Sequence, residues 1–242
     1  SRTLAVDYDP AAVAPTWRAW LADIFQTEPE RIGLLQEIMG WTLCRDNLGI
    51  EKAAIMIGPS RSGKGTIIRV MQALLQGAAG VFHLPELNSG KVLSSMRECN
   101  VAIDPDTASP AKKNARQIVG LFKSISANEP IAVQLLFTQK TWQGPLDCKL
   151  LLAANSVPTM WDDSAATANR WIPLVFDRSF LGKEDPTLAK RLIAELPGIA
   201  VWALAGLQRL MAQGRFTMPE SSRNELDNMI QSGSPVEQFI DE

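Results

Sequence analysis

Apolar residues near the amino terminus recur at helical spacing. Between residues 15 and 26 they stand three or four positions apart, at Trp17, Trp20, Leu21, Ile24 and Phe25. Thr27-Glu28-Pro29-Glu30 then has the pattern of a capping box that opens a second helix. We therefore expect residues 1–48 to form a small helical lead-in whose tryptophans are core residues rather than ligand contacts.

From Lys52 onward the pattern changes to short, continuous apolar runs separated by helical stretches. Four runs are predicted to be strands: Ala53–Ile57, Val101–Ile103, Leu150–Ala154 and Ile172–Phe176. Continuous apolar strands are typical of sheets covered on both faces, and their alternation with helices favours an α/β fold. The predicted fold is a central, mostly parallel sheet flanked by helices. Ile131–Phe137 and Trp142–Leu146 are predicted to form a hairpin.

The last quarter of the chain has a long helical pattern interrupted by a proline. We expect Pro197 to kink or divide this helix, Gly214 to end it, and residues 215–235 to form a polar linker. The predicted organisation is a lead-in at 1–48, a core at 49–182 and a helical segment at 183–242. The chain starts without methionine and stops within an apolar-periodic stretch, so we expect it to be part of a longer polypeptide.

Composition narrows the classes of function. With 242 residues and 46% hydrophobic side chains, the chain can bury one sizeable core, and its net charge of −2 gives no global basic field for nucleic acid. Three cysteines without Cys-x-x-Cys spacing favour a reducing compartment. The single histidine, His83, leaves almost no material for a His-rich metal site or a His-dependent triad. No apolar run reaches the length of a membrane span, so a cytoplasmic location is expected.

The residues after the first predicted strand have the pattern of a phosphate-binding loop. They are Gly58, Pro59, Ser60, Arg61, Ser62, Gly63, Lys64, Gly65 and Thr66, followed by a helical run. Glycines let backbone N–H groups face phosphate oxygens, the helix dipole favours an anion, and Lys64 can bridge the β- and γ-phosphates. The alternative is a Gly-rich surface turn. Gly65 stands where a Mg²⁺-binding Ser or Thr is usual, so Thr66 is the remaining candidate hydroxyl, displaced by one residue.

Polar side chains mark the ends of the other predicted strands. Asp104 and Asp106 follow the second strand and offer carboxylates for Mg²⁺ and an attacking water, and spacing does not choose between them. Asn155 ends the third strand, where an amide can orient water without adding charge. Arg170 precedes the fourth strand and Arg178 follows it; either guanidinium can stabilise charge on a neighbour's phosphate. The plain alternatives are an Asp-Pro turn, an Asn turn and solvated arginines.

A local positive stretch lies between the second and third strands. From Thr107 to Asn128 there is no acid, but there are four cations: Lys112, Lys113, Arg116 and Lys123. Such a stretch binds phosphates without sequence preference. A solvated helix face is the alternative for Lys112 and Lys113.

Together these motifs resemble the superfamily 3 helicase module of phage and plasmid primase-helicases over nearly the whole chain. The matching segments are the lead-in from Tyr8-Asp9-Pro10 to Gly40-Trp41-Thr42-Leu43, the loop Gly58–Thr66, Lys123–Pro130, Leu152–Pro158, and Asn169-Arg170 with Phe176–Phe180. Aligning the motifs places the family's acid nearer Asp106 than Asp104. Members often have paired arginines where this chain has Asn169-Arg170, so Arg170 is the candidate arginine finger.

The resemblance implies an AAA+-type P-loop ATPase that forms a ring, usually a hexamer, and moves along single-stranded DNA during replication of a mobile element. It implies that ATP and Mg²⁺ are bound by the loop, Thr66 and one of the two acids, with Asn155 positioning water and a neighbour's Arg170 completing the site. Lys140 is then expected in a pore hairpin and Lys123 in the motif preceding it, both contacting DNA. Relatives commonly carry a primase-like region before this module and a winged-helix segment after it.

Two other functions are compatible with the sequence. One is a nucleotide-dependent DNA-binding or assembly module that does not unwind DNA on its own, which the missing hydroxyl at Gly65 motivates. The other is a small-molecule nucleotide kinase, because Gly-Lys-Gly-Thr also occurs in adenylate-kinase-like loops. A kinase of that type needs an arginine-rich lid, whereas residues 107–170 contain few arginines.

Overall fold

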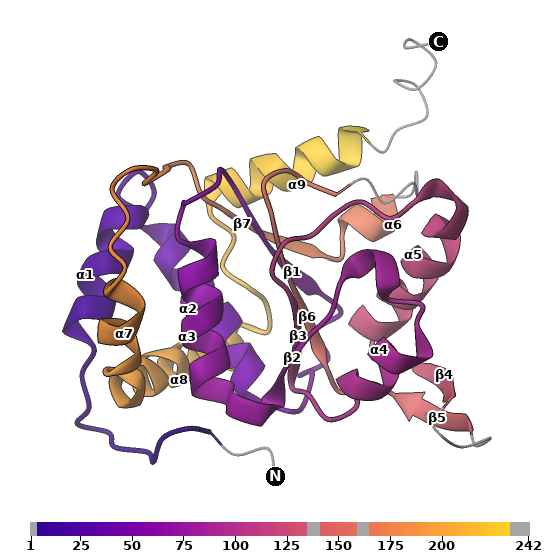
Figure 1. Ribbon diagram of the computed structural model, residues 1–242, viewed down its shortest axis with the longest axis horizontal. Helices are drawn as coiled ribbons and strands as arrows, with labels where there is room; N and C mark the ends of the chain where they lie inside the picture. Colours follow the sequence, from indigo (N-terminus) through magenta and orange to yellow (C-terminus); the bar gives the residue numbers. More distant parts are fainter. Residues whose placement is uncertain (1–3, 135–140, 159–164, 233–242) are drawn as a thin grey trace.

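The computed structural model describes residues 4–134, 141–158 and 165–232, and its centre is a five-stranded parallel sheet (Figure 1). The strands are β1 (Ala53–Ile57), β2 (Ala79–Val81), β3 (Val101–Asp104), β6 (Lys149–Ala154) and β7 (Trp171–Val175). Their order is β2-β3-β6-β1-β7, and every neighbouring pair is parallel. The predicted α/β fold is confirmed, and the arrangement is that of a P-loop NTPase-like fold.

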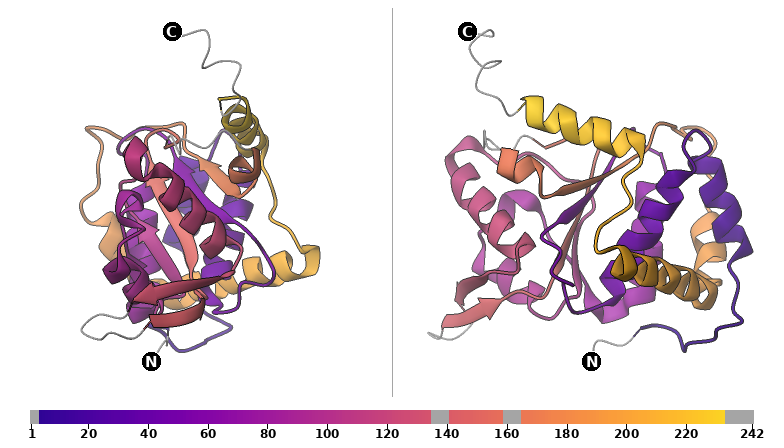
Figure 2. Two further views of the ribbon diagram at one scale, coloured as in Figure 1. Left: turned by 90° about the vertical axis from the view of Figure 1, so that its right-hand side faces the viewer. Right: turned by 180° about the vertical axis from the view of Figure 1, so that it is seen from behind.

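Helices cover both faces of the sheet (Figure 2). The first layer contains α1 (Pro15–Ile24), α2 (Glu30–Leu43), α3 (Lys64–Leu75), α7 (Leu188–Ile193) and α8 (Leu196–Gln213). The second contains α4 (Gly90–Met96), α5 (Lys112–Ser126) and a two-stranded hairpin of β4 (Pro130–Gln134) and β5 (Thr141–Pro145). Short 3-10 turns η1 (Gln76–Ala78) and η2 (Leu84–Glu86) and helix α6 (Ala165–Ala168) connect these elements.

Alternate side chains of each strand enter the two layers, as the pleat requires. In β1, Ala54 and Met56 belong to the core beneath α1, α2, α3 and α8, whereas Ala53, Ile55 and Ile57 belong to the core beneath α4 and α5. Both faces of the strand are therefore buried. This explains why the strands are continuous apolar runs in the sequence.

The carboxyl-terminal segment differs from the prediction. The prediction of a polar linker over residues 215–235 is wrong, because Glu220–Ser232 forms helix α9. This helix lies alongside edge strand β7 (Figure 1). Met229 is buried, and Leu226 and Ile230 pack beside it. These three apolar residues, spaced three and four apart in an otherwise polar helix, supply a narrow buried face that covers the sheet edge.

Three local predictions concern helix ends. The capping box at Thr27 is wrong, because α2 begins after Pro29 without a side-chain cap and the Thr27 hydroxyl donates to Asp177 instead. Pro197 lies in the first turn of α8 and so separates α7 from α8, as expected. Gly214 ends α8 in the left-handed region with φ +64°, as expected. None of the helices within the described ranges is long and apolar enough to cross a lipid bilayer.

Helices α2 and α8 cross at unusually short range. A Cβ on Gly40 would lie 2.4 Å from the carbonyl oxygen of Ala203, and one on Gly206 would lie 2.2 Å from that of Gln36. Only glycine fits at these two positions, so the backbones approach directly. The lead-in and the carboxyl-terminal helices thereby share one core.

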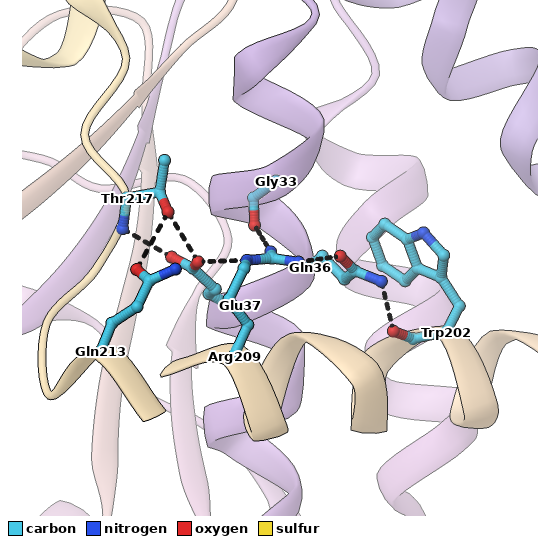
Figure 3. A network of polar contacts seen from close by, with 7 residues as sticks. All are labelled: Gly33, Gln36, Glu37, Trp202, Arg209, Gln213 and Thr217. Atoms are coloured by element: carbon cyan, nitrogen blue, oxygen red, sulfur yellow. Dashed lines mark hydrogen bonds and ion pairs between the residues drawn. The ribbon is translucent and has the colours of Figure 1, made fainter. Parts of the chain in front are cut away.

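A buried polar network joins the same two helices (Figure 3). The Glu37 side chain on α2 is 0% exposed, and its carboxylate accepts hydrogen bonds from Arg209 Nε, Thr217 N and Thr217 Oγ1, each at 2.7 Å. Arg209 on α8 also donates to Gly33 O and Gln36 Oε1. The network fixes α2, α8 and the segment that leads to α9.

A second buried cation ties the lead-in to the sheet. Lys149, at the start of β6, is 2% exposed, and its ammonium donates to the carbonyl oxygens of Cys44, Arg45 and Asp46 at 2.5, 2.7 and 2.9 Å. These carbonyls follow the carboxyl end of α2, where the helix dipole favours a cation. Burial lowers the pKa of Lys149 from 10.5 to about 8.

This shift predicts a measurable pH dependence of stability. Between pH 8 and 10.5 the unfolded chain still protonates Lys149 while the folded chain does not, so the unfolded state binds more protons and stability rises with pH. The free energy of unfolding of the protein with Lys149, compared with that of the Lys149→Met variant, should therefore increase across this window by on the order of 3 kcal/mol. Urea denaturation at pH 7, 8.5 and 10 measures the difference.

The matched proteins should both carry Cys44→Ala, because burial raises the pKa of the Cys44 thiol and its titration overlaps the window. A difference in stability that stays constant or falls between pH 8 and 10 would contradict the assignment.

Candidate functional site

The predicted phosphate loop joins β1 to α3 at the carboxyl-terminal edge of the sheet. Gly58 has φ +152°, and a Cβ there would lie 2.2 Å from the carbonyl oxygen of Phe176 on the neighbouring segment. Gly63 has φ +106°, and a Cβ there would lie 3.1 Å from Cζ2 of Trp20. Both positions require glycine, because an L side chain would be strained in the backbone and crowded in space.

The backbone of the loop is arranged to receive an anion. Within the described residues, the backbone N–H groups of residues 60–65 donate no hydrogen bond. Helix α3 begins directly at Lys64, so its positive dipole end faces the same place. Free N–H groups at the start of a helix are the usual protein ligands of phosphate.

The Lys64 ammonium lies inside the loop. Its Nζ donates to Gly58 O at 2.6 Å and to Pro59 O at 2.9 Å, and lies 3.3 Å from Ser62 Oγ and 3.4 Å from Asn155 Oδ1. Burial lowers its pKa, and the negative charge of nearby Asp106 opposes that shift. The loop's own carbonyl groups thus contact the cation that a phosphate would meet.

The sheet brings Asn155 to the loop. Strands β1 and β6 are parallel neighbours with Ile57 opposite Ala154, so the residue after β6 lies beside the residue after β1. The two predicted site residues from separate strands, Lys64 and Asn155, therefore meet through this pairing.

The two candidate acids lie in different surroundings. Asp104 is 0% exposed; its carboxylate accepts a hydrogen bond from Leu84 N at 2.8 Å and lies 3.3 Å from His83 Nδ1, so it faces β2 and η2. Asp106 is exposed, and its charge acts on Lys64. Asp104 therefore holds the end of β3 against the neighbouring segment, and Asp106 remains the candidate acid whose charge acts on the loop lysine.

The residues available for a divalent cation are few. In the described part of the chain, no three His, Cys, Asp or Glu side chains gather as a metal site. Mg²⁺ is usually held by one or two carboxylates together with substrate phosphates and water. Asp106, whose charge acts on Lys64, and Thr66, which lies in the first turn of α3, are the candidate ligands for a cation of that kind.

Arg170 lies at the amino-terminal ends of the strands, opposite to the ends that carry the loop. Strands β1 and β7 are parallel with Ala53 opposite Trp171, so Arg170 precedes the amino-terminal end of β7, about 20 Å along the strand from the loop. Its Nη1 lies 3.2 Å from Glu51 Oε2, and the side chain is 20% exposed. Arg170 cannot reach the loop of its own chain.

The segment after β7 packs against the loop. Phe180 N donates to Arg61 O at 2.9 Å and Ser179 Oγ to Ser60 O at 2.8 Å. Arg178 pairs with Asp23 of α1 at 3.1 Å. Sequence reasoning missed these contacts and that of Trp20 with Gly63, because nothing in the local pattern shows which distant segment will lie beside the loop.

Of the two predicted DNA-contacting residues, the structure describes Lys123. Lys123 is in the last turn of α5, shortly before β4 of the hairpin. Lys112, Lys113 and Arg116 lie on the exposed side of the same helix. Lys140 lies outside the described residues, as does the predicted hairpin turn.

Comparison with known proteins gives a structural likeness only. No known family profile matches the chain, and no curated protein matches it by sequence. Three structures of the C-terminal region of NrS-1 in its apo form are similar, with TM-scores of 0.72, 0.71 and 0.66 at 12, 13 and 12% identity. They cover 98, 98 and 94% of this chain and 56, 55 and 54% of their own. The chain therefore spans about half the length of these structures and has the same fold over nearly all its own length.

Proposed function

We propose that this chain is the ATP-hydrolysing motor module of a ring-forming translocase or helicase that acts on single-stranded DNA. The observation that carries the proposal is the meeting of Lys64 and Asn155 at one end of a glycine loop whose N–H groups donate to no acceptor among the described residues, with the charge of Asp106 acting on Lys64. A cation, an amide and a carboxylate beside a phosphate cradle are the groups that phosphoryl transfer to water requires. The resemblance to superfamily 3 helicases and the fold shared with the NrS-1 region support it.

In this proposal each residue has a distinct task. Lys64 exchanges the carbonyl oxygens of Gly58 and Pro59 for phosphate oxygens, and the loop N–H groups bind the remaining charge. Asn155 accepts a hydrogen bond from the attacking water and so orients it. Asp106 and Thr66 hold Mg²⁺, which neutralises charge on the phosphates when it is bound.

The position of Arg170 supports a site shared between subunits. Arg170 lies at the amino-terminal ends of the strands, whereas its own loop lies at their carboxyl-terminal ends. It can therefore stabilise transition-state charge only on a nucleotide held by another chain. A guanidinium suits this role because its planar donors match phosphate oxygens.

The test is the ATPase rate per subunit, measured over a range of protein concentrations with and without an oligo-dT strand. We expect the rate to rise with both, and Lys64→Ala to lose at least about 100-fold in nucleotide affinity or turnover, as removal of a main phosphate contact should. A rate independent of concentration and of DNA would overturn the proposal. Hydrolysis without strand separation would favour the assembly module considered above.

Gly65 gives a second prediction about the metal. A Cβ at Gly65 would meet only the Arg69 guanidinium, at 3.9 Å, so Gly65→Ser fits without rearrangement and supplies the usual hydroxyl. One added ligand worth about 1.4 kcal/mol should lower the Mg²⁺ concentration for half-maximal turnover about tenfold.

Gly65→Ala is the matched control for this prediction, since it adds the same Cβ without an oxygen. An equal response to serine and alanine would show that the hydroxyl does not reach the cation. The measurement is a Mg²⁺ titration of ATP turnover at saturating nucleotide.

A further inference from the structure

We propose that Arg31 of α2 is a positioning residue of the nucleotide site, which acts through the segment after β7 to hold the phosphate loop in its binding shape. The inference rests on the proposed function, because it concerns the same loop. Among the described residues the polar contacts of Arg31 are with Glu28, Asp177 and Ser221, all outside the loop. Any effect of Arg31 on nucleotide binding is therefore indirect.

The segment after β7, residues 176–180, forms one wall of the phosphate loop. The Phe176 carbonyl oxygen lies only 2.2 Å from the place that a Cβ on Gly58 would take. Further along, Ser179 Oγ and Phe180 N donate to the carbonyl oxygens of loop residues 60 and 61 at 2.8 and 2.9 Å. The beginning and the middle of the loop both touch this segment, so a shift of the segment would change the shape of the loop.

The corner between α1 and α2, residues 23–31, holds three consecutive residues of this segment. The contacts are the Phe25 ring with that of Phe176, with centroids 5.0 Å apart, Thr27 Oγ1 with Asp177 Oδ2 at 2.6 Å, and Asp23 Oδ1 with Arg178 Nη1 at 3.1 Å. The middle residue, Asp177, also pairs with Arg31. The wall of the loop is thus fixed from the corner as well as from β7.

Arg31 is the buried cation of this corner. Its side chain is 7% exposed; Nε donates to Glu28 Oε2 at 2.7 Å and to Ser221 Oγ at 3.0 Å, and Nη1 lies 3.1 Å from Asp177 Oδ2. One guanidinium therefore joins the corner, the segment after β7 and the start of α9. A planar guanidinium also fixes the directions of its partners, which the point charge of a lysine does not do.

Both carboxylates around Arg31 are kept ionised. Burial alone would raise the pKa of Asp177, but the hydrogen bond from Thr27 and the charge of Arg31 outweigh burial and lower this pKa. Burial is likewise outweighed at Glu28, whose pKa is lowered by the hydrogen bond with Ser221 and by Arg31. A half-buried carboxylate that loses its counter-ion gains from moving toward water. Without Arg31, Asp177 would therefore move and carry the wall of the loop with it.

The ion pair of Arg31 with Asp177 supplies geometry more than net stability. Removing two charges from water costs about as much as their attraction returns, so a buried ion pair adds little to the free energy of folding. Its directions are nevertheless fixed, and they set where Phe176 lies against Gly58. We therefore expect nucleotide affinity to depend on this pair in a way that loss of stability does not explain.

The experiment measures the dissociation constant of a fluorescent ADP analogue by anisotropy for Arg31→Met, Asp177→Asn and the double variant. We expect each single variant to weaken binding about tenfold, within the range for residues that act on a site without touching its ligand. The double variant should bind no more weakly than either single variant, because all three lack the same contact. Turnover at saturating ATP should change less than about twofold, since Arg31 touches no reacting group.

Two matched variants separate positioning from lost charge and from lost stability. Arg45→Met breaks the ion pair with Asp147, 3.4 Å apart, near the amino-terminal end of β6, and should keep the affinity. Ile118→Ala opens the core beneath α4 and α5, where Ile118 is 0% exposed, and should lower stability while keeping the affinity. The urea midpoint of every variant is measured beside its affinity.

The outcomes distinguish this inference from the proposed function. Unchanged affinity in Arg31→Met and Asp177→Asn, in a protein whose binding requires Lys64, would overturn the inference and leave the proposed function intact. Equal weakening in Ile118→Ala would also overturn it, because the effect would then follow stability. Nucleotide binding that is the same in Lys64→Ala would refute the proposed function together with the inference. If Arg31→Met does not fold, Asp177→Asn, which keeps the shape of the side chain, decides alone.

Discussion

Arg170→Ala is expected to slow ATP turnover by about 10³-fold, the lower range for an arginine that stabilises a phosphoryl transition state from a neighbouring subunit. Nucleotide affinity should change less than twofold, because Arg170 lies about 20 Å along the sheet from its own loop and contacts Glu51 instead. Turnover at saturating ATP and equilibrium binding of a fluorescent ATP analogue separate the two effects. Arg215→Ala, which removes an exposed arginine between α8 and α9, is the matched control.

Mixing two inactive variants tests whether the arginine acts between chains. A subunit with Arg170→Ala keeps an intact loop, and a subunit with Lys64→Ala keeps an intact Arg170, so mixed assemblies contain some complete sites. We expect activity to reappear when the two proteins are combined and to reach its highest value near equal amounts. No recovery, together with normal assembly of the mixture, would show that both residues serve a site within one chain.

The parts of the site that the sequence predicted are those governed by the parallel sheet. Lys64 and Asn155 follow strands whose apolar runs are unmistakable, and the carboxyl ends of neighbouring parallel strands lie at one edge. The order of the strands was not predicted, but any order that made these two strands neighbours would bring the two residues together. The fold class depends on the same apolar runs, and it was predicted for the same reason.

The parts that escaped prediction depend on side-chain direction or on distant packing. Asp104 and Asp106 are two residues apart, and only the structure shows that Leu84 N donates to the first whereas the charge of the second acts on Lys64. The short strand β2 has three residues, of which one is a glycine, so its apolar signal in the sequence is weak. Helix α9 packs only three apolar residues, Leu226, Met229 and Ile230, so its helical pattern in the sequence is weak.

Glu37→Ala is expected to lower the free energy of unfolding by about 3–5 kcal/mol, the usual cost of breaking a buried charged network from one side. Removing the carboxylate leaves Arg209 Nε, Thr217 N and Thr217 Oγ1 without their acceptor where α2 and α8 approach most closely (Figure 3). Urea denaturation followed by tryptophan fluorescence measures the change.

Gln213→Ala is the control at the rim of the same network. Gln213 Oε1 lies 3.4 Å from Thr217 Oγ1 in exposed surroundings, so its removal should cost less than about 0.5 kcal/mol. Equal costs for the two variants would show that Glu37 is as replaceable as a surface residue.

The loss of Glu37 also affects the loop, because Glu37 holds α2 in place. Arg31 of α2 pairs with Asp177, and the preceding residue, Phe176, has the carbonyl group that confines Gly58. The core beneath α2 and α8 therefore supports the phosphate loop as well as the fold.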